Sequence, residues 1–548
     1  MDIANFDPEK ICDLNGAKIA FRAFLNIFEE LQTENARLRN ENQELRDEIM
    51  RLKGEKGKPN IPGNKGGSTN VSSEKERRKP GSWAKGSKND KIKITRREVQ
   101  RLDRSKLPSD AEFKGYEETI IQDIKISLDN VLFQREKYYS PSRQETFLAP
   151  LPPGYSGQYG PGIKVFVLSQ YYLCNVTEPK IKAFLDSVGV TISEGEVSTL
   201  VLDPDQKFRR EREDVLKAGL TSSTYQHMDD TGTRVDGKNQ HCHIICNSYF
   251  TYYSTRPRKD RLTILDVLLG RTGERCYYLN EKAYTLIRGF NGSERIIRLL
   301  QTTFPQEREI SEKDFLGLLQ KHLPEIGAIQ RMRILEAGAI VAYHVQTSFP
   351  IVYLLITDDA PQFKEITAEH ALCWVHDGRH YKKLQPWVQL HRKQLDDFLD
   401  SYWKYYDQLL QFKQNPCPEV RARLEKEFEV LFSTKTGYDQ LDERIGKTLA
   451  KKASLLKVID HPEIPLHNNP AELGARTRVR KRDASFGPRN EKGKEAWDTF
   501  MTHVETTKKL GISFFEFLTD RIFGTKTIAN LGTVITELAK RNPLCNSP

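Results

Sequence analysis

Three acidic residues of the chain occur in settings that suit ligands of a metal ion. Asp229 occurs in YQHMDDTGTRV, Asp358 in IVYLLITDDAPQF and Glu472 in PLHNNPAELGAR. The two aspartates are predicted at the ends of short β-like runs, where the edge of a sheet holds a carboxylate rigidly. The glutamate falls in the first turn of a helix that begins after Asn-Asn-Pro. Three such oxygen donors suit a hard cation such as Mg²⁺.

Each aspartate has an acidic neighbour, Asp230 or Asp359, that competes for the same role. Consecutive side chains of a strand face opposite sides, so only one of each pair can point into a site. Taken singly, an Asp-Asp pair is more often a turn or a helix cap, and Glu472 could simply complement the helix dipole. The combination favours a metal site.

The chemistry that these residues indicate is metal-assisted attack on a phosphodiester. The anionic diester repels nucleophiles, and its alkoxide is a poor leaving group. Two metal ions about 4 Å apart lower both barriers, since one ion generates the nucleophile and the other stabilises the leaving oxygen. We therefore expect two Mg²⁺ or Mn²⁺ ions.

The elements around these acids follow an α/β pattern. TYQHMDD, HCHIICNS and YFTYYSTR predict three closely spaced strands, and helix-like and mixed segments follow over 260–346. IVYLLITDD predicts a strand buried on both faces, and ALCWV a further strand followed by a basic helix from His380. Residues 385–457 are predicted to be helical, and another helix follows Asn469. The pattern predicts an α/β domain with a helical insertion.

Three blocks of the sequence resemble the signature blocks of bacterial DDE transposases of the insertion-sequence 66 class: HMDDTGTRV, LLITDDAPQF with ALCWVHDGRH, and PLHNNPAELGARTRVRKR. The resemblance covers nearly the whole chain. It implies an N-terminal coiled coil, a middle DNA-binding portion and a C-terminal ribonuclease-H-like catalytic domain. By the match, Asp229 and Asp358 are the family's two aspartates and Glu472 is its glutamate. Phe363 is the aromatic residue that follows the second aspartate.

Cys373 and His376 form a C-x-x-H pair that many such transposases carry. Taken alone it reads as half of a zinc site, but no second pair is spaced to complete it. The alternative, which we prefer, is a structural Cys373 together with a His376 near the phosphate, where His376, Asp230 and Asp359 would support the active site.

No zinc is predicted elsewhere in the chain. Family members commonly carry a cysteine zinc module before the Pro-rich segment, but REKYYSPSRQETFLAPLP contains no cysteine. His241, Cys242, His243 and Cys246 alternate between the two faces of one strand, so at most two of them could converge.

Positive charge is concentrated in two places. Residues 51–110 hold 18 Lys and Arg against 7 Asp and Glu, which matches the net charge of +10 of the whole chain. This segment favours a polyanion partner, although a solubilising linker has a similar composition. After Glu472, five cations fall within about three helical turns and suit contact with a DNA backbone or form a solvated face. The predicted DNA contacts are Arg476, Arg478, Arg480, Lys481, Arg482, Arg96 and Arg97.

A heptad pattern over residues 20–54 predicts a parallel two-stranded coiled coil. Leucine recurs at one seam position and asparagine at the other, where a buried Asn fixes register and oligomer state. A single amphipathic helix packed on its own domain is the alternative. The dimerisation residues expected from the pattern are Leu31, Asn35, Leu38, Asn42, Leu45 and Leu52.

The chain is expected to be a multidomain α+β protein. KIKAFLDSVGVTISEGEVSTLV has a helix-turn-helix rhythm with a Ser-capped second helix, although any short helical hairpin looks similar. The expected parts are an N-terminal helix and coiled coil (1–54), a basic flexible linker (55–90), a small β-rich module (91–160), a helical DNA-binding module (161–215), the ribonuclease-H-like domain (216–384 with 458–515), its helical insertion (385–457) and a helical tail (516–548).

Composition limits the class of protein. At 548 residues, three or four domains are expected. No apolar run approaches the roughly 18 to 20 residues that span a bilayer. The acidic N-terminus lacks a signal-peptide core, and eight scattered cysteines suggest a reducing compartment. We therefore expect a cytoplasmic, nucleoid-associated protein without a membrane partner.

The sequence predicts a metal-dependent transposase that acts on double-stranded DNA, at both transposon ends and target, as a homodimer or higher assembly. A catalytically inactive DNA-binding regulator or accessory protein derived from such an enzyme is the main alternative. A structure-selective nuclease on the same fold is a third.

Overall fold

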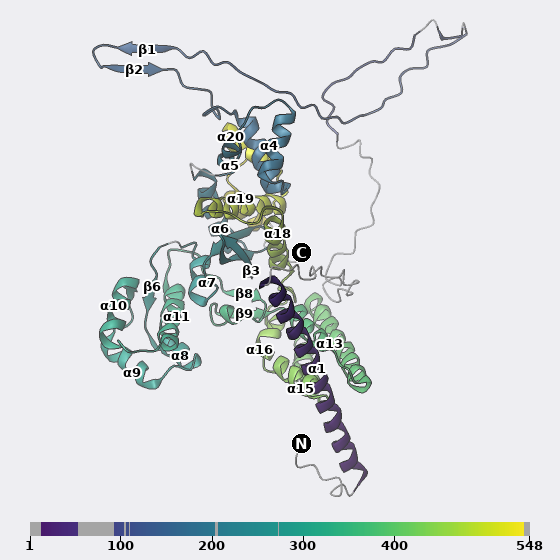
Figure 1. The fold of residues 1–548 in the computed structure, drawn as a ribbon, viewed down its shortest axis with the longest axis vertical. Coiled ribbons are helices and arrows are strands. Elements are labelled where there is room, and N and C mark those ends of the chain that lie inside the picture. Colours follow the sequence, from purple (N-terminus) through teal and green to yellow (C-terminus); the bar gives the residue numbers. More distant parts are fainter. Residues whose placement is uncertain are drawn as a thin grey trace.

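A five-stranded sheet lies at the centre of the computed structural model, which describes residues 13–52, 92–103, 106–108, 110–202, 206–271 and 273–541 (Figure 1). Strands β3 (Tyr225–Val235), β4 (Lys238–Cys246) and β5 (Thr251–Arg256) are antiparallel. Strands β8 (Leu354–Thr357) and β9 (Glu369–Leu372) add to β3 in parallel, so the order is β5-β4-β3-β8-β9. This mixed sheet is consistent with a ribonuclease-H-like core.

Local sequence explains the central strands. Asp236 and Gly237 join β3 to β4 with positive φ angles of 51° and 71°, the backbone that a tight two-residue hairpin requires. All four residues of β8 are buried, as its apolar sequence predicts. The predicted strands TYQHMDD, HCHIICNS, YFTYYSTR and IVYLLITDD are confirmed.

The edge strand β5 is covered by helix α19 (Glu491–Lys509). Side chains spaced four residues apart on the helix accept hydrogen bonds from alternate N–H groups of the strand. Thr506 accepts from Thr251 at 3.2 Å, and Thr502 from Tyr253 at 3.0 Å. Asp498 accepts from Thr255 N at 2.6 Å. These contacts satisfy backbone groups that an open sheet edge would leave unpaired.

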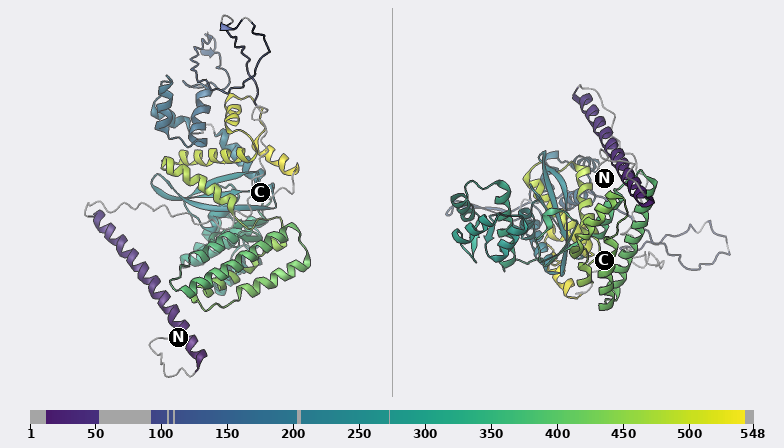
Figure 2. Two further views of the ribbon diagram at one scale, coloured as in Figure 1. Left: turned by 90° about the vertical axis from the view of Figure 1, so that its right-hand side faces the viewer. Right: turned by 90° about the horizontal axis from the view of Figure 1, so that it is seen from below.

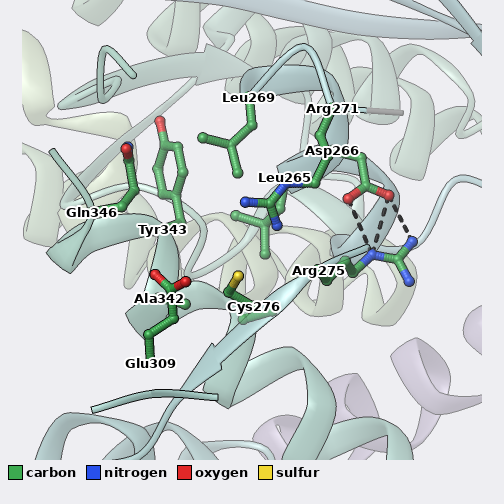
Figure 3. A pocket seen from close by; sticks show the side chains of 11 residues that line it. Leu265, Asp266, Leu269, Arg271, Arg275, Cys276, Glu309, Ala342, Tyr343 and Gln346 are labelled. Carbon is green, nitrogen blue, oxygen red and sulfur yellow. Dashed lines mark hydrogen bonds and ion pairs between the residues drawn. The ribbon is translucent and has the colours of Figure 1, made fainter. Parts of the chain in front are cut away.

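Helices and a small two-stranded antiparallel sheet fill the segment between β5 and β8, as predicted for 260–346. They are α7 (Arg261–Leu268), β6 (Cys276–Tyr278), α8 (Glu281–Gly289), α9 (Glu294–Thr303), β7 (Glu309–Ser311), α10 (Glu312–His322) and α11 (Ala328–Val345). A pocket lies among α7, β6 and α11 (Figure 3). In it the Asp266 carboxylate pairs with Arg275 at 2.6 Å. None of the three candidate metal ligands lines this pocket.

A helical insertion follows β9. It contains α12 (Trp374–Lys382), α13 (Gln389–Gln414), α14 (Pro418–Phe432), α15 (Asp439–Leu449), α16 (Lys452–Leu455) and α17 (Lys457–Asp460). Trp374 is fully buried among Tyr402, Phe428 and Phe432. The predicted start of the basic helix at His380 is wrong, because α12 begins at Trp374. The Cys373 thiol accepts from His376 N at 3.4 Å and thereby caps the helix where ALCWV was predicted to continue as a strand.

Short helices form the module before the sheet: α3 (Pro161–Leu168), the π-helix η5 (Ser169–Leu173), α4 (Glu178–Ser187), α5 (Glu194–Leu200) and α6 (Lys207–Thr221). Ser193 accepts from Glu196 N at 3.1 Å, so the predicted serine cap of α5 is confirmed. Near the C-terminus, α20 (Phe514–Phe523) packs on α3, and α21 (Leu531–Arg541) packs on α6.

The predicted β-rich module at 91–160 is wrong over its described residues. Their only strands are β1 (Lys137–Ser140) and β2 (Glu145–Leu148), an exposed hairpin that projects from the body (Figure 1). The described parts of KIKITRREVQRL and EETIIQDIKISL form no strand. Ile121, Ile124 and Leu132 are each more than 80% exposed. The alternating pattern was present, but no second layer covers its apolar residues, and isolated strands are not stable.

The N-terminal helix α1 (Leu14–Leu52) has the predicted extent of the heptad pattern, and it projects beyond the body of the protein (Figure 2). The predicted basic linker at 55–90 lies outside the described residues. No helix that the structure describes is both long and apolar enough to cross a bilayer.

Candidate active site

Adjacent parallel strands bring the two aspartates together. The pairing of β3 with β8 ends at His227 opposite Ile356. Two residues further along both strands lie Asp229 and Asp358, at the same edge of the sheet. Asp358 directly follows β8, as predicted. The prediction that Asp229 ends its strand is wrong, because β3 continues to Val235 in its hairpin with β4.

Burial and neighbouring charges both act on the pKa values of the aspartates. Burial and, to a smaller extent, the charges of Asp358, Glu472 and Asp230 raise the pKa of Asp229 to about 7, against a hydrogen bond from the Asp230 N–H. Burial also raises the pKa of Asp358, with the charges of Asp230 and Asp359. The hydrogen bond from the Ala360 N–H and the charge of the nearby His376 lower the pKa of Asp358.

Asn468 fixes the helix that carries the third acid. Glu472 lies in the first turn of α18 (Asn469–Ser485), as predicted. The buried Asn468 amide donates to the Met228 carbonyl at 2.8 Å, and its oxygen lies 3.0 Å from Nδ1 of His227. The start of α18 is therefore tied to β3 immediately before Asp229. At Gly474, an added Cβ would stand 2.9 Å from Ile244, so glycine allows α18 to approach the sheet closely.

Cys373 joins the same assembly. Its thiol accepts hydrogen bonds from His376 N at 3.4 Å and from Asn468 N at 3.3 Å. Its own N–H donates to Thr357 O at 3.0 Å, one residue before Asp358. Burial raises the pKa of the Cys373 thiol to about 12, so it is protonated at neutral pH. These contacts give Cys373 a structural role, one of the two alternatives considered from the sequence.

Glu472 is held by arginines. Its two carboxylate oxygens lie 3.2 and 3.1 Å from the Arg379 guanidinium in a bidentate pair, and Arg476 lies 3.7 Å away. Among the described residues, no group of three or more His, Cys, Asp or Glu side chains is gathered closely enough to hold a metal. Sequence reasoning missed Arg379. Its position on α12, one turn after His376, was the signal that could have indicated it.

Two comparisons with known proteins bear on this arrangement. The family model described as "Transposase IS66 family" matches residues 341–496, a range that includes Asp358 and Glu472. An uncharacterized protein, y4jO of Sinorhizobium fredii, is 32% identical over 329 residues, which are 59% of this chain and 100% of that protein. The chain belongs to the IS66 transposase family. Asp229 lies outside the matched range.

The rival acids have other partners. Asp359 pairs with Lys451 at 2.6 Å and Lys364 at 3.0 Å, and these cations lower its pKa although burial raises it. Asp230 accepts from Gln362 at 2.7 Å. Both side chains are therefore bonded to neighbouring protein groups, and Asp229 and Asp358 remain the candidate ligands.

Lys451 links this edge of the sheet to the helical insertion. Besides Asp359, it lies 3.6 Å from Asp377, a buried carboxylate that also bonds Arg444 and Thr448 of α15. Asp359, the residue next to Asp358, is thus held by a contact from outside the sheet.

Two of the cations predicted to contact DNA do not reach the surface. Arg478 is fully buried, 3.5 Å from Asp498 and over the ring of Trp497. Lys481 is also fully buried and donates to the Tyr171 carbonyl. Their prediction as DNA contacts is wrong, because they lie on the face of α18 that points into the protein. Arg476 and Arg480 are exposed, Arg482 is half-buried, and Arg96 and Arg97 are exposed.

The raised pKa of Asp229 predicts a pH-dependent stability. From its ordinary value of 3.8 up to about 7, the folded protein binds more protons than the unfolded chain, so the free energy of unfolding falls as pH rises. Without divalent metal, Asp229→Asn should be more stable than the wild type above pH 7, by about 1–3 kcal/mol. The difference should shrink toward pH 4. Urea unfolding across this range measures it, and parallel pH profiles of the two proteins would contradict the assignment.

Asn468 should matter more than its neighbour Asn469. Asn468→Ala leaves a buried carbonyl and a buried imidazole without their partner, so we expect a loss of about 1–3 kcal/mol of unfolding free energy. Asn469→Ala is the matched control, because no hydrogen bond to β3 depends on its side chain. Chemical denaturation of both variants measures the difference. Equal losses would show that Asn468 does not anchor α18.

Proposed function

We propose that the chain is an active DDE transposase that cuts DNA at transposon ends and joins the freed ends to target DNA. The observation that carries the proposal is the placement of the acids: Asp229 and Asp358 follow the paired residues of two adjacent parallel strands, and Asn468 ties the helix of Glu472 to β3 beside Asp229. These acids come from β3, the end of β8 and the first turn of α18. The family match over residues 341–496 supports the same reading.

The donor set fits Mg²⁺ or Mn²⁺. All three candidate ligands are carboxylates, and hard divalent cations prefer oxygen. Two such ions, when bound, would neutralise charge on the phosphodiester and lower the pKa of the attacking water. Before Glu472 can act as a ligand, its carboxylate must separate from Arg379.

The chain's own groups orient the DNA. His376 lies near Asp358, and the half-buried Arg379 and the exposed Arg476 lie beside Glu472. These side chains suit contact with the phosphates on either side of the scissile bond. Water attacks the phosphorus at the transposon end and releases a 3′-hydroxyl. That hydroxyl then attacks a target phosphodiester in line, and no covalent enzyme intermediate is needed.

The exposed cations of α18 extend this surface. Arg476 and Arg480 lie four residues apart, on the same side of the helix as Glu472. We propose that they contact the DNA backbone close to the acids, together with Arg482, Arg96 and Arg97. The helices between Pro161 and Leu200 are the proposed module for recognising the end sequence.

Cleavage and strand transfer of terminal DNA with Mg²⁺ test the catalytic proposal. Asp229→Ala, Asp358→Ala and Glu472→Ala should each reduce nicking on the order of a hundredfold or more, since misplaced catalytic groups cost about that much. Asp483→Ala, on the exposed side of α18, is the matched control.

If the three variants nick like the wild type, the metal-ligand assignment is wrong. If all proteins, the wild type included, bind DNA without cutting it, the chain is a regulator derived from a transposase. Nicking without strand transfer would instead indicate a nuclease.

The salt dependence of DNA affinity distinguishes the exposed Arg476 and Arg480 from the buried Arg478. In Arg476→Ala/Arg480→Ala, two phosphate contacts are lost, so the slope of log affinity against log salt should fall by about two. Arg478→Met should change stability and leave that slope unchanged, because Arg478 is buried. Fluorescence anisotropy at several salt concentrations measures both. An equal slope for the wild type and the double variant would exclude these two arginines.

A further inference from the structure

Phe486, the residue that follows helix α18, has an unusual backbone for its residue type. Its φ angle is 59°, in the left-handed region that glycine adopts easily and bulky residues adopt rarely. Its N–H donates to Arg482 O at 2.7 Å and closes the last turn of the helix. A glycine at this position would end the helix in the same way without strain from a Cβ atom. Helix termination therefore does not explain the aromatic side chain.

Burial does not explain the ring either. Phe486 is 89% exposed, the highest fraction among the large apolar side chains that the structure describes. The ring therefore gains little of the free energy that burial of a phenyl group usually contributes to folding. A strained backbone that packing of the side chain does not offset is typical of a residue with a role in binding.

The backbone after Phe486 is held against the turn between β3 and β4. An added Cβ at Gly487 would stand 2.6 Å from Arg234 O, so glycine allows this close approach. Pro488 O accepts a hydrogen bond from Asp236 N at 3.1 Å. The exposed ring thus stands on a backbone that is fixed on both sides, by the helix before it and by the hairpin turn after it.

Phe486 and Glu472 lie at opposite ends of one helix. Helix α18 packs along β3 (Figure 1), with Glu472 in its first turn and Phe486 directly after its last residue. About 21 Å of helix separate the two residues, which corresponds to about six base steps of B-DNA. The exposed Arg476 and Arg480, proposed above as contacts of the DNA backbone, lie between them. DNA that follows this face of α18 away from the acids reaches the ring.

Positive charge predominates on the elements that meet at Phe486. Asp483 is paired with Arg482 at 3.5 Å, and Glu491 is paired with Lys494, so the charges of these two acids are offset. Asp236, in the hairpin turn, is a further exposed acid. The exposed cations of the same elements are Arg234, Lys238, Arg480, Arg489 and Lys492. An exposed aromatic ring among cations suits a nucleobase and the phosphates on either side of it.

We propose that Phe486 stacks on a nucleobase of the bound DNA, at a step where base pairing is disrupted. The inference rests on the proposed action on DNA, but not on catalysis by the three acids. Every base has a π-face, so stacking on an aromatic ring requires no particular sequence. Disrupting a base step is costly, and a ring that is already held in place offsets part of that cost.

The contact would fix the position of the DNA relative to the acids. Because α18 carries Glu472 at one end and Phe486 follows the other, the stacked base lies about six base steps from the phosphate at the acids. Arg476 and Arg480 attract any DNA backbone in between and do not distinguish one step from the next. The ring recognises a disrupted step by shape.

Phe515 shows how Phe486 differs from an ordinary exposed aromatic residue. It is 51% exposed, and it lies within helix α20 with a helical backbone. Single apolar residues on a surface are common and need no binding partner. Phe515 therefore serves as the matched control for Phe486.

Photocross-linking of the full-length protein tests the contact directly. The probe is a DNA duplex with one unpaired 5-iododeoxyuridine, a base that cross-links under irradiation to an aromatic ring stacked on it. Without divalent metal, the wild type should form a cross-link that mass spectrometry assigns to Phe486. Phe486→Tyr and Phe515→Ala should keep a cross-link at position 486, and Phe486→Ala should lose it.

Fluorescence anisotropy measures the preference for the disrupted step. The wild type should bind the duplex with the unpaired base about tenfold more tightly than the fully paired duplex, since stacking on one base contributes about that factor. Phe486→Ala should bind both duplexes equally. DNA binding without a cross-link at Phe486 would refute the inference alone, whereas a wild type that binds no DNA would refute the proposed function as well.

A contact with protein instead of DNA gives a different result. If Phe486→Ala keeps the preference for the unpaired base but changes the sedimentation of the protein without DNA, the ring packs on a second copy of the chain and the inference is wrong.

Phe486→Gly separates binding from folding. Glycine adopts the left-handed backbone without strain, so this variant should unfold at a higher urea concentration than the wild type and should lose the cross-link. Unfolding of Phe486→Gly at a lower urea concentration would show that the ring supports the fold, and would contradict the inference.

Discussion

The mutual repulsion of carboxylates is the constraint on which the rest of this structure depends. Asp229, Asp358 and Glu472 come from three different elements, and burial together with the charges of Asp358 and Glu472 opposes ionisation of Asp229, whose pKa is raised. Such a cluster does not assemble through its own contacts. It has to be imposed by elements that are stable for other reasons, and the sheet, α18 and α12 meet this requirement.

A different set of contacts fixes the position of each acid. Asp229 is fixed in the middle of a hairpin whose strands pair on both sides of it. Asp358 is fixed by the parallel pairing of β8 and by the Cys373 N–H, which bonds the residue before it. Glu472 depends on Asn468, which ties its helix to β3. Arg379 then offsets the negative charge at the one acid that stands on a helix.

The motifs and the sheet could be predicted from sequence because they depend on local pattern. Apolar runs, a turn sequence and a Pro-started helix were sufficient to place Asp358 and Glu472. The β-rich module at 91–160 failed because alternation indicates a strand only when another layer covers its apolar side. Nothing in the described structure covers Ile121 or Ile124.

Side-chain direction was the other source of error. Arg478 and Lys481 were grouped with their neighbours by charge, but α18 is buried at Ala471, Gly474 and Ala475, and both cations continue that buried face. Helical periodicity would have separated them from Arg476 and Arg480. Arg379 was missed because it acts across 93 residues of sequence, a distance at which only the fold shows the contact.

The helical insertion connects the outermost helix to the acids. At one end, the start of α13 is capped by Glu29 of α1. At the other, Lys451 holds Asp359, the residue next to Asp358. Between them, Asp377 bonds Arg444 and Thr448 of α15 and places α12, which carries His376 and Arg379, on the same bundle. If the bundle shifted, these polar side chains would lose their hydrogen-bonding and ion-pair partners. Such a loss is costly for groups that are shielded from water. The insertion therefore gives α1 and the second aspartate a common rigid support.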